Sequence, residues 1–415
     1  MVYVISQNGQ PLMPTENHAK VRILLKNKKA KVIKRCPFTI QLAYDSTNYT
    51  QDITLGVDSG SKHIGLSATT RNKVLFESDV ELRNDIVNLL STRRQNRRTR
   101  RNRKTRYRKP RFNNRRRKEG WLAPSVQNKV DSHLTVIRKV HEILPITKII
   151  VEVASFDIQK IKNPTISGTE YQQGEQLNFW NVREYVLFRD GHICQCCKGK
   201  SKDKILNVHH IESRKTGGDA PNNLITICET CHNDYHQGKI QLNIKRGKSF
   251  RDAAFMGIMR KTLLLRLKQI YPNVQETFGY ITKNTRVGNS LPKEHYIDAR
   301  CISGNPLAKP FGYYLYQKCI RRQNRKINRD KFIKGGIKKK NRLAGDVFGF
   351  GLFDTVGYQK EKYFVFGRRK RGDFDIRTLD GEKINNGSIS YKKLRLIQKN
   401  NNILTERRLP ILPHH

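Results

Sequence analysis

The chain has 415 residues, of which 82 are Lys or Arg and 35 are Asp or Glu, so its formal net charge is +47. This length allows two to four domains with cores of their own, and the charge predicts a polyanionic partner, because a compact chain so strongly charged repels itself. Membrane binding is excluded as a main function, because the basic runs lack an accompanying apolar face.

Residues 1–50 are expected to form a small basic module, which either caps the fold or contacts nucleic acid. From Ile53 three apolar segments follow one another, ITLGVDSG, IGLSATT and VLFESDVEL, and they predict consecutive strands. Asp58 lies near the end of the first. A carboxylate in an apolar strand is unfavourable to bury unless it is paired or binds a metal. We therefore expect an RNase H-like sheet in which Asp58 is a metal ligand, with a structural salt bridge as the alternative.

Residues 93–118 contain 16 Lys or Arg and no acid. Like charges four residues apart repel on a helix, so a helix here needs phosphates as counter-charges. Arginine dominates, which suits bidentate phosphate binding. We expect a helix in a nucleic-acid groove, broken at Pro110; a disordered basic tail is less favoured, because the run is internal. The residues expected to contact nucleic acid are Arg93, Arg94, Arg97, Arg98, Arg100, Arg101, Arg103, Lys104, Arg106 and Arg108.

Residues 125–144 have the 3.6-residue period of a helix, and KIIVEVASFD reads as a buried strand that carries Glu152. A polar linker over residues 163–175 and a helical segment over 178–191 come next. This alternation of helices and strands predicts a mixed α/β protein.

Residues 192–238 combine two Cys-x-x-Cys pairs with four histidines. Two such pairs suit one tetrahedral structural Zn²⁺, because each turn offers two thiolates. Thiolate ligands and unpaired cysteines favour a reducing compartment, so we expect a cytoplasmic, nucleoid-associated protein. No apolar run is long enough for a membrane span, and no signal peptide is evident. The expected Zn²⁺ ligands are Cys194, Cys197, Cys228 and Cys231.

The histidines of the same stretch suit a nuclease site. His210 is the candidate general base, and His209, on the opposite face of the strand, can bind a metal with His232 and His236, which lie four apart on one helical face. Asn223 could hold the imidazole of the base and fix its tautomer. The alternative is a zinc knuckle that only recognises its partner.

Past residue 240 we expect a long amphipathic helix over residues 250–272, then a strand and turn over 275–288. His295 and Asp298 follow, three apart on one helical face. Asp58, Glu152 and Asp298 could bind two metal ions about 4 Å apart, as two-metal phosphodiester cleavage requires, and His295 could activate or position the attacking water. Residues 320–342 form a second basic run, interpreted as a linker, and the tail from residue 346 predicts a small β-barrel.

The order Cys-x-x-Cys, His-His, Asn, Cys-x-x-Cys-His-x-x-x-His resembles the HNH endonuclease family, and the three acids resemble a RuvC-like nuclease split into three parts. With PLMP at residues 11–14 and the arginine-rich run, the whole chain resembles the IscB family of transposon-associated RNA-guided DNA nucleases, relatives of the type II CRISPR effectors. The implied domains are an N-terminal PLMP domain (1–50), RuvC part I (51–82), a bridge helix (83–120), RuvC part II (121–162), a linker (163–177), an HNH domain (178–245), RuvC part III (246–319), a basic linker (320–345) and a C-terminal β domain (346–415).

This resemblance implies a monomeric protein in a ribonucleoprotein with a guide RNA (ωRNA), acting on double-stranded DNA. The HNH site would cut the guide-paired strand with one Mg²⁺, and the RuvC site the displaced strand with two. The C-terminal domain would read a short motif flanking the target. Two alternatives are a guide-free HNH homing or restriction nuclease and a catalytically inactive RNA-binding scaffold.

Overall fold

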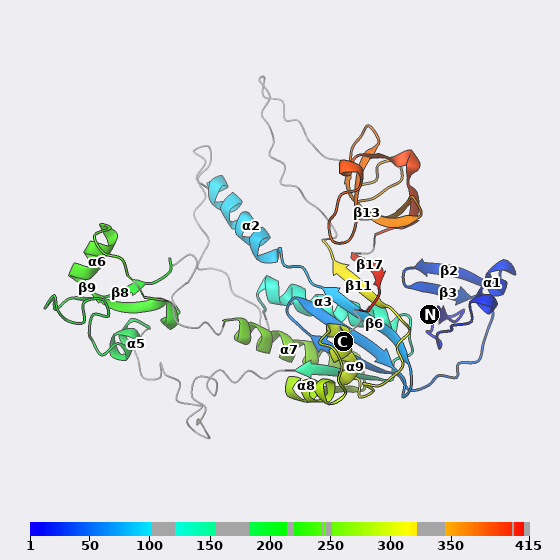
Figure 1. The fold of residues 1–415 in the computed structure, drawn as a ribbon, viewed down its shortest axis with the longest axis horizontal. Coiled ribbons are helices and arrows are strands. Elements are labelled where there is room, and N and C mark those ends of the chain that lie inside the picture. Colours follow the sequence, from blue (N-terminus) through cyan, green and yellow to red (C-terminus); the bar gives the residue numbers. More distant parts are fainter. Residues whose placement is uncertain are drawn as a thin grey trace. The chain divides into compact units, whose positions relative to one another are not determined.

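A computed structural model of the chain describes residues 1–101, 121–153, 182–213, 220–242, 244–245, 251–321, 345–400 and 402–410. The chain forms two compact units (Figure 1). The larger combines Met1–Ala154 with Ile258–His415, and the smaller is Ser155–Gly257. The smaller unit is thus inserted into the sequence of the larger one, and each has a hydrophobic core of its own.

A seven-stranded mixed sheet forms the centre of the larger unit. β4, β5 and β6 are antiparallel neighbours in chain order, β7 is parallel to β4, and β10 is parallel to β7. At the other edge, β11 is parallel to β6 and β17 is antiparallel to β11. In spatial order the strands are β10 (Val274–Phe278), β7 (Lys148–Val153), β4 (Thr54–Ser59), β5 (His63–Thr69), β6 (Val74–Glu81), β11 (Tyr314–Cys319) and β17 (Ile403–Arg408).

The three strands predicted between residues 53 and 82 are confirmed as β4, β5 and β6. Their apolar side chains are buried, and they pack with those of α3 (Pro124–His141) and α7 (Arg251–Ile270) in one core. The apolar residues of α3 recur at helical spacing and are buried, as the periodicity predicted. Helix α7 likewise confirms the helix expected over residues 250–272.

Helix α9 (His295–Ile302) packs directly on β4 and β5. Two glycines make this close approach possible. A Cβ at Gly56 would overlap the carbonyl oxygen of Ala299, and one at Gly65 would overlap that of His295. Because neither strand carries a side chain at the crossing, the helix backbone lies against the strand backbone.

Of the strand and turn expected over residues 275–288, the strand is confirmed as β10, but the turn is wrong, because the chain continues as helix α8 (Gly279–Gly288). Glycines at both ends of the segment resemble turn signals, and its interior is rich in Thr and Asn, which have modest helix propensity. Packing overrides these local preferences, since α8 contacts α9, β7 and β10.

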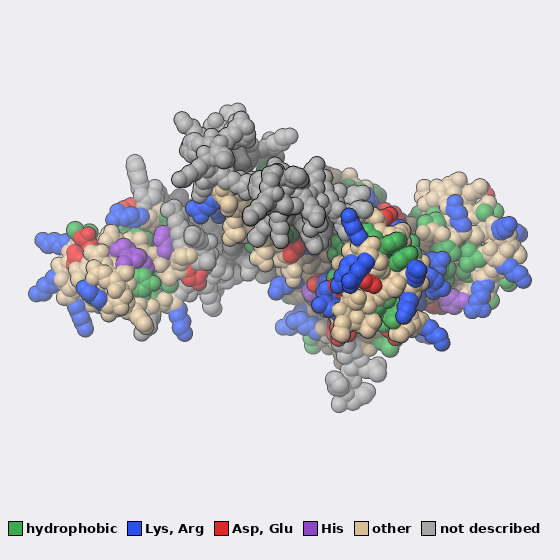
Figure 2. Space-filling view, turned by 90° about the horizontal axis from the view of Figure 1, so that it is seen from above, with side chains coloured by type: hydrophobic (Ala, Val, Ile, Leu, Met, Phe, Trp, Pro, Cys, Tyr) green, Lys and Arg blue, Asp and Glu red, His purple; other side chains and the backbone are tan. Residues whose placement is uncertain are grey.

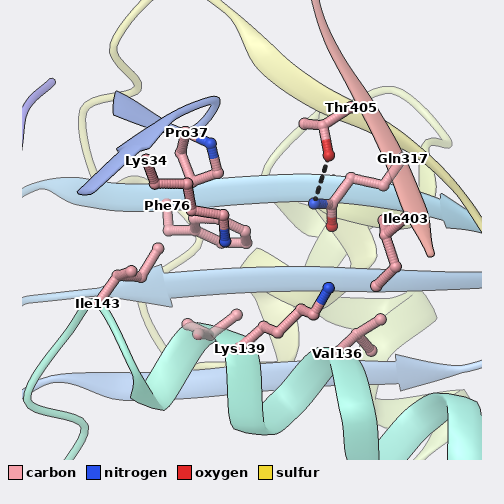
Figure 3. A pocket seen from close by; sticks show the side chains of 10 residues that line it. Lys34, Pro37, Phe76, Val136, Lys139, Ile143, Gln317, Ile403 and Thr405 are labelled. Atoms are coloured by element: carbon pink, nitrogen blue, oxygen red, sulfur yellow. Dashed lines mark hydrogen bonds between the residues drawn. The ribbon is translucent and has the colours of Figure 1, made fainter. Parts of the chain in front are cut away.

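The N-terminal module is a three-stranded sheet in the order β1-β3-β2 with one helix. Its elements are β1 (Tyr3–Ile5), α1 (His18–Lys26), β2 (Ala30–Arg35) and β3 (Phe38–Leu42). A cavity of about 20 Å³ lies where this module meets α3 and the central sheet (Figure 3). Gln317 donates a hydrogen bond to Thr405 there, at 3.2 Å. Burial and the neighbouring Lys34 lower the pKa of Lys139, which lines the cavity, to about 8.

The C-terminal module contains a five-stranded antiparallel sheet in the order β15-β14-β13-β12-β16. Among the described residues its edge strands each pair with one neighbour, and its strands share one buried core, so the predicted barrel is confirmed only as a half-open one. The last strand of the tail, β17, pairs with the central sheet instead. The elements are β12 (Thr355–Tyr358), β13 (Glu361–Arg368), β14 (Asp373–Arg377), η3 (Asn385–Gly387), β15 (Ile389–Ser390), η4 (Tyr391–Lys393) and β16 (Arg395–Gln398).

The smaller unit is built on a hairpin of two antiparallel strands, in which Leu206 lies opposite Cys228 and His210 opposite Leu224. Its elements are α5 (Val182–Arg189), β8 (Leu206–His210), η2 (Pro221–Asn223), β9 (Leu224–Cys228) and α6 (Glu229–His236). Histidine side chains reach the surface of this unit, drawn in purple in Figure 2.

Helix α2 (Ile86–Arg101) contains the first nine residues of the arginine-rich run, 93–101. Lys and Arg side chains are spread widely over the face shown in Figure 2, with fewer acidic ones between them. Within the part of the chain that the structure describes, no helix is both long and apolar enough to cross a membrane.

Candidate functional site

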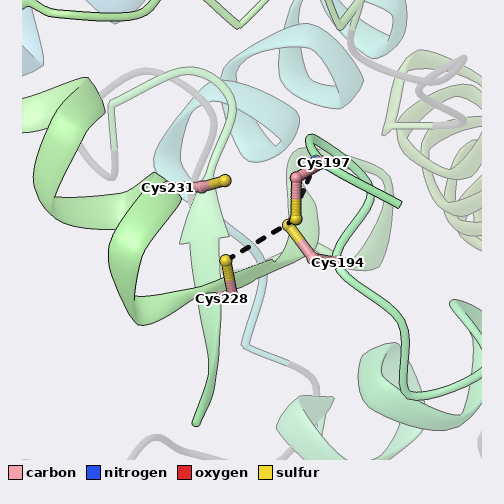
Figure 4. A group of neighbouring side chains, drawn as sticks. All are labelled: Cys194, Cys197, Cys228 and Cys231. Carbon is pink, nitrogen blue, oxygen red and sulfur yellow. Dashed lines mark hydrogen bonds between the residues drawn. The ribbon is translucent and has the colours of Figure 1, made fainter. Parts of the chain in front are cut away.

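Four cysteines converge in the smaller unit, at one end of the β8–β9 hairpin (Figure 4). Cys194 and Cys197 lie in the turns after α5, Cys228 ends β9, and Cys231 lies in the first turn of α6. All four sulfur atoms are within 4.8 Å of one another, and those of Cys197 and Cys228 are 3.9 Å apart. No disulfide links them, because all four are free thiols.

This cluster has the chemistry of a metal site. Burial raises the pKa of Cys194, and burial with neighbouring thiols raises that of Cys231, whereas the Ser201 hydroxyl lowers the pKa of Cys197 to about 6. Several thiolates so close together need a cation to balance them. Four sulfur ligands suit tetrahedral Zn²⁺, so the residues present fit a structural metal ion.

A second cluster lies on the same hairpin, where His209 of β8 faces His232 and His236 of α6. One ring nitrogen of each is within 4.8 Å of the others, and the Nε2 atoms of His232 and His236 are 3.3 Å apart. Burial lowers the pKa of His209 to about 4, with the two other imidazoles adding to the effect. The ring is therefore neutral at physiological pH, the form that binds a metal.

The Nε2 atom of His209 is buried and accepts no hydrogen bond among the described residues. A buried nitrogen without a partner is unfavourable unless another group, such as a metal ion, binds it. A cavity of about 460 Å³ opens at this point, and its lining includes His209, His210, His232 and His236. The cluster fits a divalent cation that is accessible to a substrate.

Asn223 is completely buried at the start of β9. Its side-chain oxygen accepts a hydrogen bond from the backbone N–H of Glu212 at 2.9 Å, and its amide nitrogen donates to the Glu212 carbonyl at 3.0 Å. Asn223 therefore holds the segment that follows His210, a role that the sequence did not suggest.

A third group of side chains lies in the larger unit, at the ends of two parallel strands. Asp58 is on β4, Glu152 is on the neighbouring β7, and α9 crosses them with His295 and Asp298. His295 donates a hydrogen bond from Nδ1 to Oδ2 of Asp58 at 2.7 Å. The structure thus gathers four predicted residues from three segments separated by more than ninety positions.

The carboxylates of this group influence one another. Burial raises the pKa of both Glu152 and Asp298, and in each case the charge of Asp58 raises it further. The hydrogen bond to Asp58 raises the pKa of His295. In the two clusters of the smaller unit, all ligand atoms lie within 4.8 Å of one another. Among the described residues, the carboxylate oxygens of the three acids do not all lie that close together.

Two arginines that the sequence analysis missed complete this group. Arg260 of α7 forms an ion pair with Glu152 at 3.5 Å and donates from Nε to the carbonyl of Ser59 at 3.0 Å. Arg286 of α8 forms an ion pair with Asp298 at 2.8 Å. No spacing motif links these arginines to the acids, since they lie on two other helices whose register the sequence does not reveal.

His63 is a further neighbour that the sequence analysis did not single out. Its ring stacks on that of His295, with centroids 5.1 Å apart and planes at 4°. Its Nδ1 atom lies 3.0 Å from Oδ1 of Asp79. The His63 ring, on β5, packs against the His295 ring and limits its movement. His63 is therefore a positioning residue for His295.

The expected nucleic-acid contacts are only partly described. Arg93, Arg94, Arg97 and Arg98 lie on α2 with exposed side chains, at spacings that repeat along the helix. Arg100 and Arg101 belong to the last turn of the same helix. Arg103, Lys104, Arg106, Arg108 and the break expected at Pro110 lie outside the described residues.

Two family models match this chain. A family described as "RRXRR protein" matches residues 2–174, and a family described as "HNH endonuclease" matches residues 194–238, which hold both clusters of the smaller unit. A stretch of 53 residues, 12% of this chain, is 39% identical to anaredoxin of Nostoc sp. and spans 70% of that protein.

Proposed function

Since this chain is an IscB-type nuclease whose HNH endonuclease domain acts on DNA with the help of a metal ion, we propose that a guide RNA directs it and that it cuts both strands of its target. In this proposal the smaller unit cuts the guide-paired strand, and the carboxylate site of the larger unit cuts the displaced strand. The observation that carries it is the presence of two separate groups of nuclease-type side chains in two separate units.

In the smaller unit, His210 is the proposed general base and Asn223 fixes the segment beside it. His209, His232 and His236 would hold one Mg²⁺, which when bound stabilises the charge that develops on the phosphate. The cysteine cluster would hold Zn²⁺ and keep the hairpin and α6 together. Because the hairpin is held rigid, His210 and the three metal-binding histidines can act on the same phosphate.

In the larger unit, Asp58, Glu152 and Asp298 would hold two Mg²⁺ ions, and His295 would position or deprotonate the attacking water. The strand order β6-β5-β4-β7-β10, antiparallel in its first half and parallel in its second, supports an RNase H-like, RuvC-type assignment. Arg260 and Arg286 neutralise part of the acidic charge before any ion binds.

Guidance by RNA is supported by charge. A net charge of +47 needs a large polyanion, and the exposed arginines of α2 are available for phosphates. The C-terminal sheet is the candidate reader of a motif beside the target. The domain boundaries given by the resemblance are part of the same proposal.

The test is cleavage of a labelled duplex by the full chain, purified with its co-expressed RNA and supplied with Mg²⁺. Exchanging only the guide segment of that RNA should move the cut to the matching duplex, and an RNA with an unrelated guide is the matched control. Specific cutting by RNA-free protein would instead favour the guide-free nuclease. Tight RNA binding without any cutting would favour the inactive scaffold.

A further inference from the structure

Two aromatic side chains are exposed where strand β10 meets helix α8. Phe278 and Tyr280 flank Gly279, and they are 40% and 66% exposed. Their rings are nearly parallel, with planes at 12° and centroids 6.1 Å apart. At this separation neither ring fully covers the other, so both present large flat faces to solvent. Exposing two adjacent aromatic rings is unfavourable without a partner.

The pair lies beside the carboxylate site. Thr277 is opposite Glu152, and Phe278 opposite Val153, in the parallel pairing of β10 with β7. A Cβ added to Gly279 would lie only 3.2 Å from Oε1 of Glu152. The backbone between the two aromatics therefore lies next to one of the proposed catalytic acids, at the end of β10. The strand pairing puts Phe278 on the sheet face of Val153, and Gly279 follows it on the side of Glu152.

The charges around the pair favour a nucleic acid on one side of it. Lys283 lies three residues after Tyr280, on the same face of α8, and is exposed. Glu276 shares the strand face of Phe278 and is also exposed. A phosphate backbone would be attracted towards Lys283 and repelled from Glu276, which gives the bound strand one preferred side.

We propose that Phe278 and Tyr280 form a stacking platform for unpaired bases of the DNA strand that enters the Asp58, Glu152 and Asp298 site. This proposal rests on the proposed function, because it needs a single strand at that site. Aromatic rings bind single strands by stacking on successive bases, and this contact tolerates any base sequence. Such tolerance suits a site that must cut whatever strand the guide displaces.

The first test measures single-turnover cleavage of each strand by the full ribonucleoprotein. Phe278→Ala and Tyr280→Ala should each slow cleavage of the displaced strand by about 5- to 100-fold, the range expected for loss of one base–aromatic stack, and leave cleavage of the guide-paired strand unchanged. Tyr280→Phe keeps the ring and should restore the wild-type rate. Tyr49→Ala, at an 88% exposed tyrosine in the segment before β4, is the matched control and should have no effect.

A scan of abasic positions separates stacking from a structural role. One abasic nucleotide near the cut in the displaced strand should slow the wild-type protein but add nothing to the defect of Tyr280→Ala, because both changes remove the same contact. Additive effects at every position would overturn the proposal. So would unchanged displaced-strand cleavage by both alanine variants, and the pair would then belong to another contact, such as a protein partner.

Photocrosslinking tests the wild-type chain directly, so that no variant needs to fold. A displaced strand carrying 5-iodouracil near the cut should crosslink to Phe278 or Tyr280. Crosslinks that map only to other residues overturn the stacking platform, even if the strand is cut. If the wild-type protein leaves the displaced strand uncut, the proposed function fails, and the position of the crosslink still decides whether the aromatic pair binds that strand.

Discussion

Cys228 is the residue on which the two clusters of the smaller unit depend together. It ends β9, is the N-cap residue of α6, and lies opposite Leu206 in the hairpin that carries His209 and His210. A metal ion held through Cys228 therefore fixes the helix that brings His232 and His236 to His209.

We predict that Cys228→Ser removes the structural metal ion, because a hydroxyl is a poor substitute for a thiolate. The bound Zn²⁺ should fall from about one per chain to a small fraction, and the smaller unit should become sensitive to protease, since metal binding and folding are coupled. Metal analysis and limited proteolysis measure the two effects. Cys196→Ser, next to the cluster but outside it, is the control and should keep both properties; equal metal loss in the two variants would contradict the assignment.

The residues of the smaller unit could be predicted because their spacing is local. Two Cys-x-x-Cys turns and the four-residue interval between His232 and His236 bring ligands together within single elements. Arg260 and Arg286 could not be predicted, because their contacts depend on how α7 and α8 pack. The hydrogen bonds of Asn223 to Glu212 likewise depend on a loop conformation that has no sequence signature.

Helix α9 brings His295 and Asp298 to the sheet because Gly56 and Gly65 have no side chains. We predict that Gly65→Ala displaces α9, since the new Cβ would overlap the carbonyl oxygen of His295 and lie 3.2 Å from Cβ of Asp58. Overpacking of this kind destabilises a protein by about 1–3 kcal/mol. Cleavage of the displaced strand should fall by at least tenfold, whereas that of the guide-paired strand persists.

Strand-resolved cleavage and thermal unfolding measure these two effects. Gly288→Ala, on α8, is the matched control, because a Cβ there meets no heavy atom within 4 Å. It should preserve the activity and leave stability equal or slightly higher. Full displaced-strand cleavage by Gly65→Ala would show that the close approach of α9 is dispensable.

Helix α3 carries a histidine that makes the stability of the larger unit depend on pH. His133 is fully buried, Nδ1 donates to the carbonyl of Lys129 at 2.7 Å, and burial lowers its pKa from 6.5 to about 4. Between these values the unfolded chain binds a proton that the folded chain does not, so stability falls as the pH drops from 6.5 to 4. The loss from this residue amounts to about 3 kcal/mol.

His133→Gln should remove this part of the pH dependence, because an amide can donate the same hydrogen bond without titrating. The difference in free energy of unfolding between wild type and variant, measured from pH 7 to pH 4, isolates the histidine. His18→Gln, at the exposed start of α1, is the control. A wild-type curve parallel to that of His133→Gln over this range would contradict the prediction.

At the scale of elements, the helices and strands that could be predicted are those whose apolar residues recur with a regular period. Strands β4, β5 and β6 and helices α3 and α7 follow that pattern, whereas a helical face at α9 was predicted from the three-residue interval between His295 and Asp298. Helix α8 was missed because its terminal glycines resemble a turn. The pairing of β17 with β11 could not be predicted, since it joins segments more than eighty residues apart and depends on the whole sheet.

At the scale of the whole molecule, one nuclease-type site lies in each compact unit, and the smaller unit is inserted between segments of the larger one. In the proposed function, each DNA strand is cut by a site of its own. Most of the positive charge belongs to the larger unit, because residues 155–257 hold 15 Lys or Arg against 11 Asp or Glu, so a large RNA would contact mainly the larger unit. Two independent sites on one RNA-directed chain are the central claim.

Strand-resolved cleavage of a duplex labelled at both 5′ ends tests this claim most directly, with guide RNA and Mg²⁺ present. Asp58→Ala should cut only the guide-paired strand, and His210→Ala only the displaced strand, each at the wild-type rate within a few-fold. Binding of the guide RNA, measured in parallel, should be unchanged in both variants. Loss of both cuts in either variant, with RNA binding intact, would contradict two independent sites.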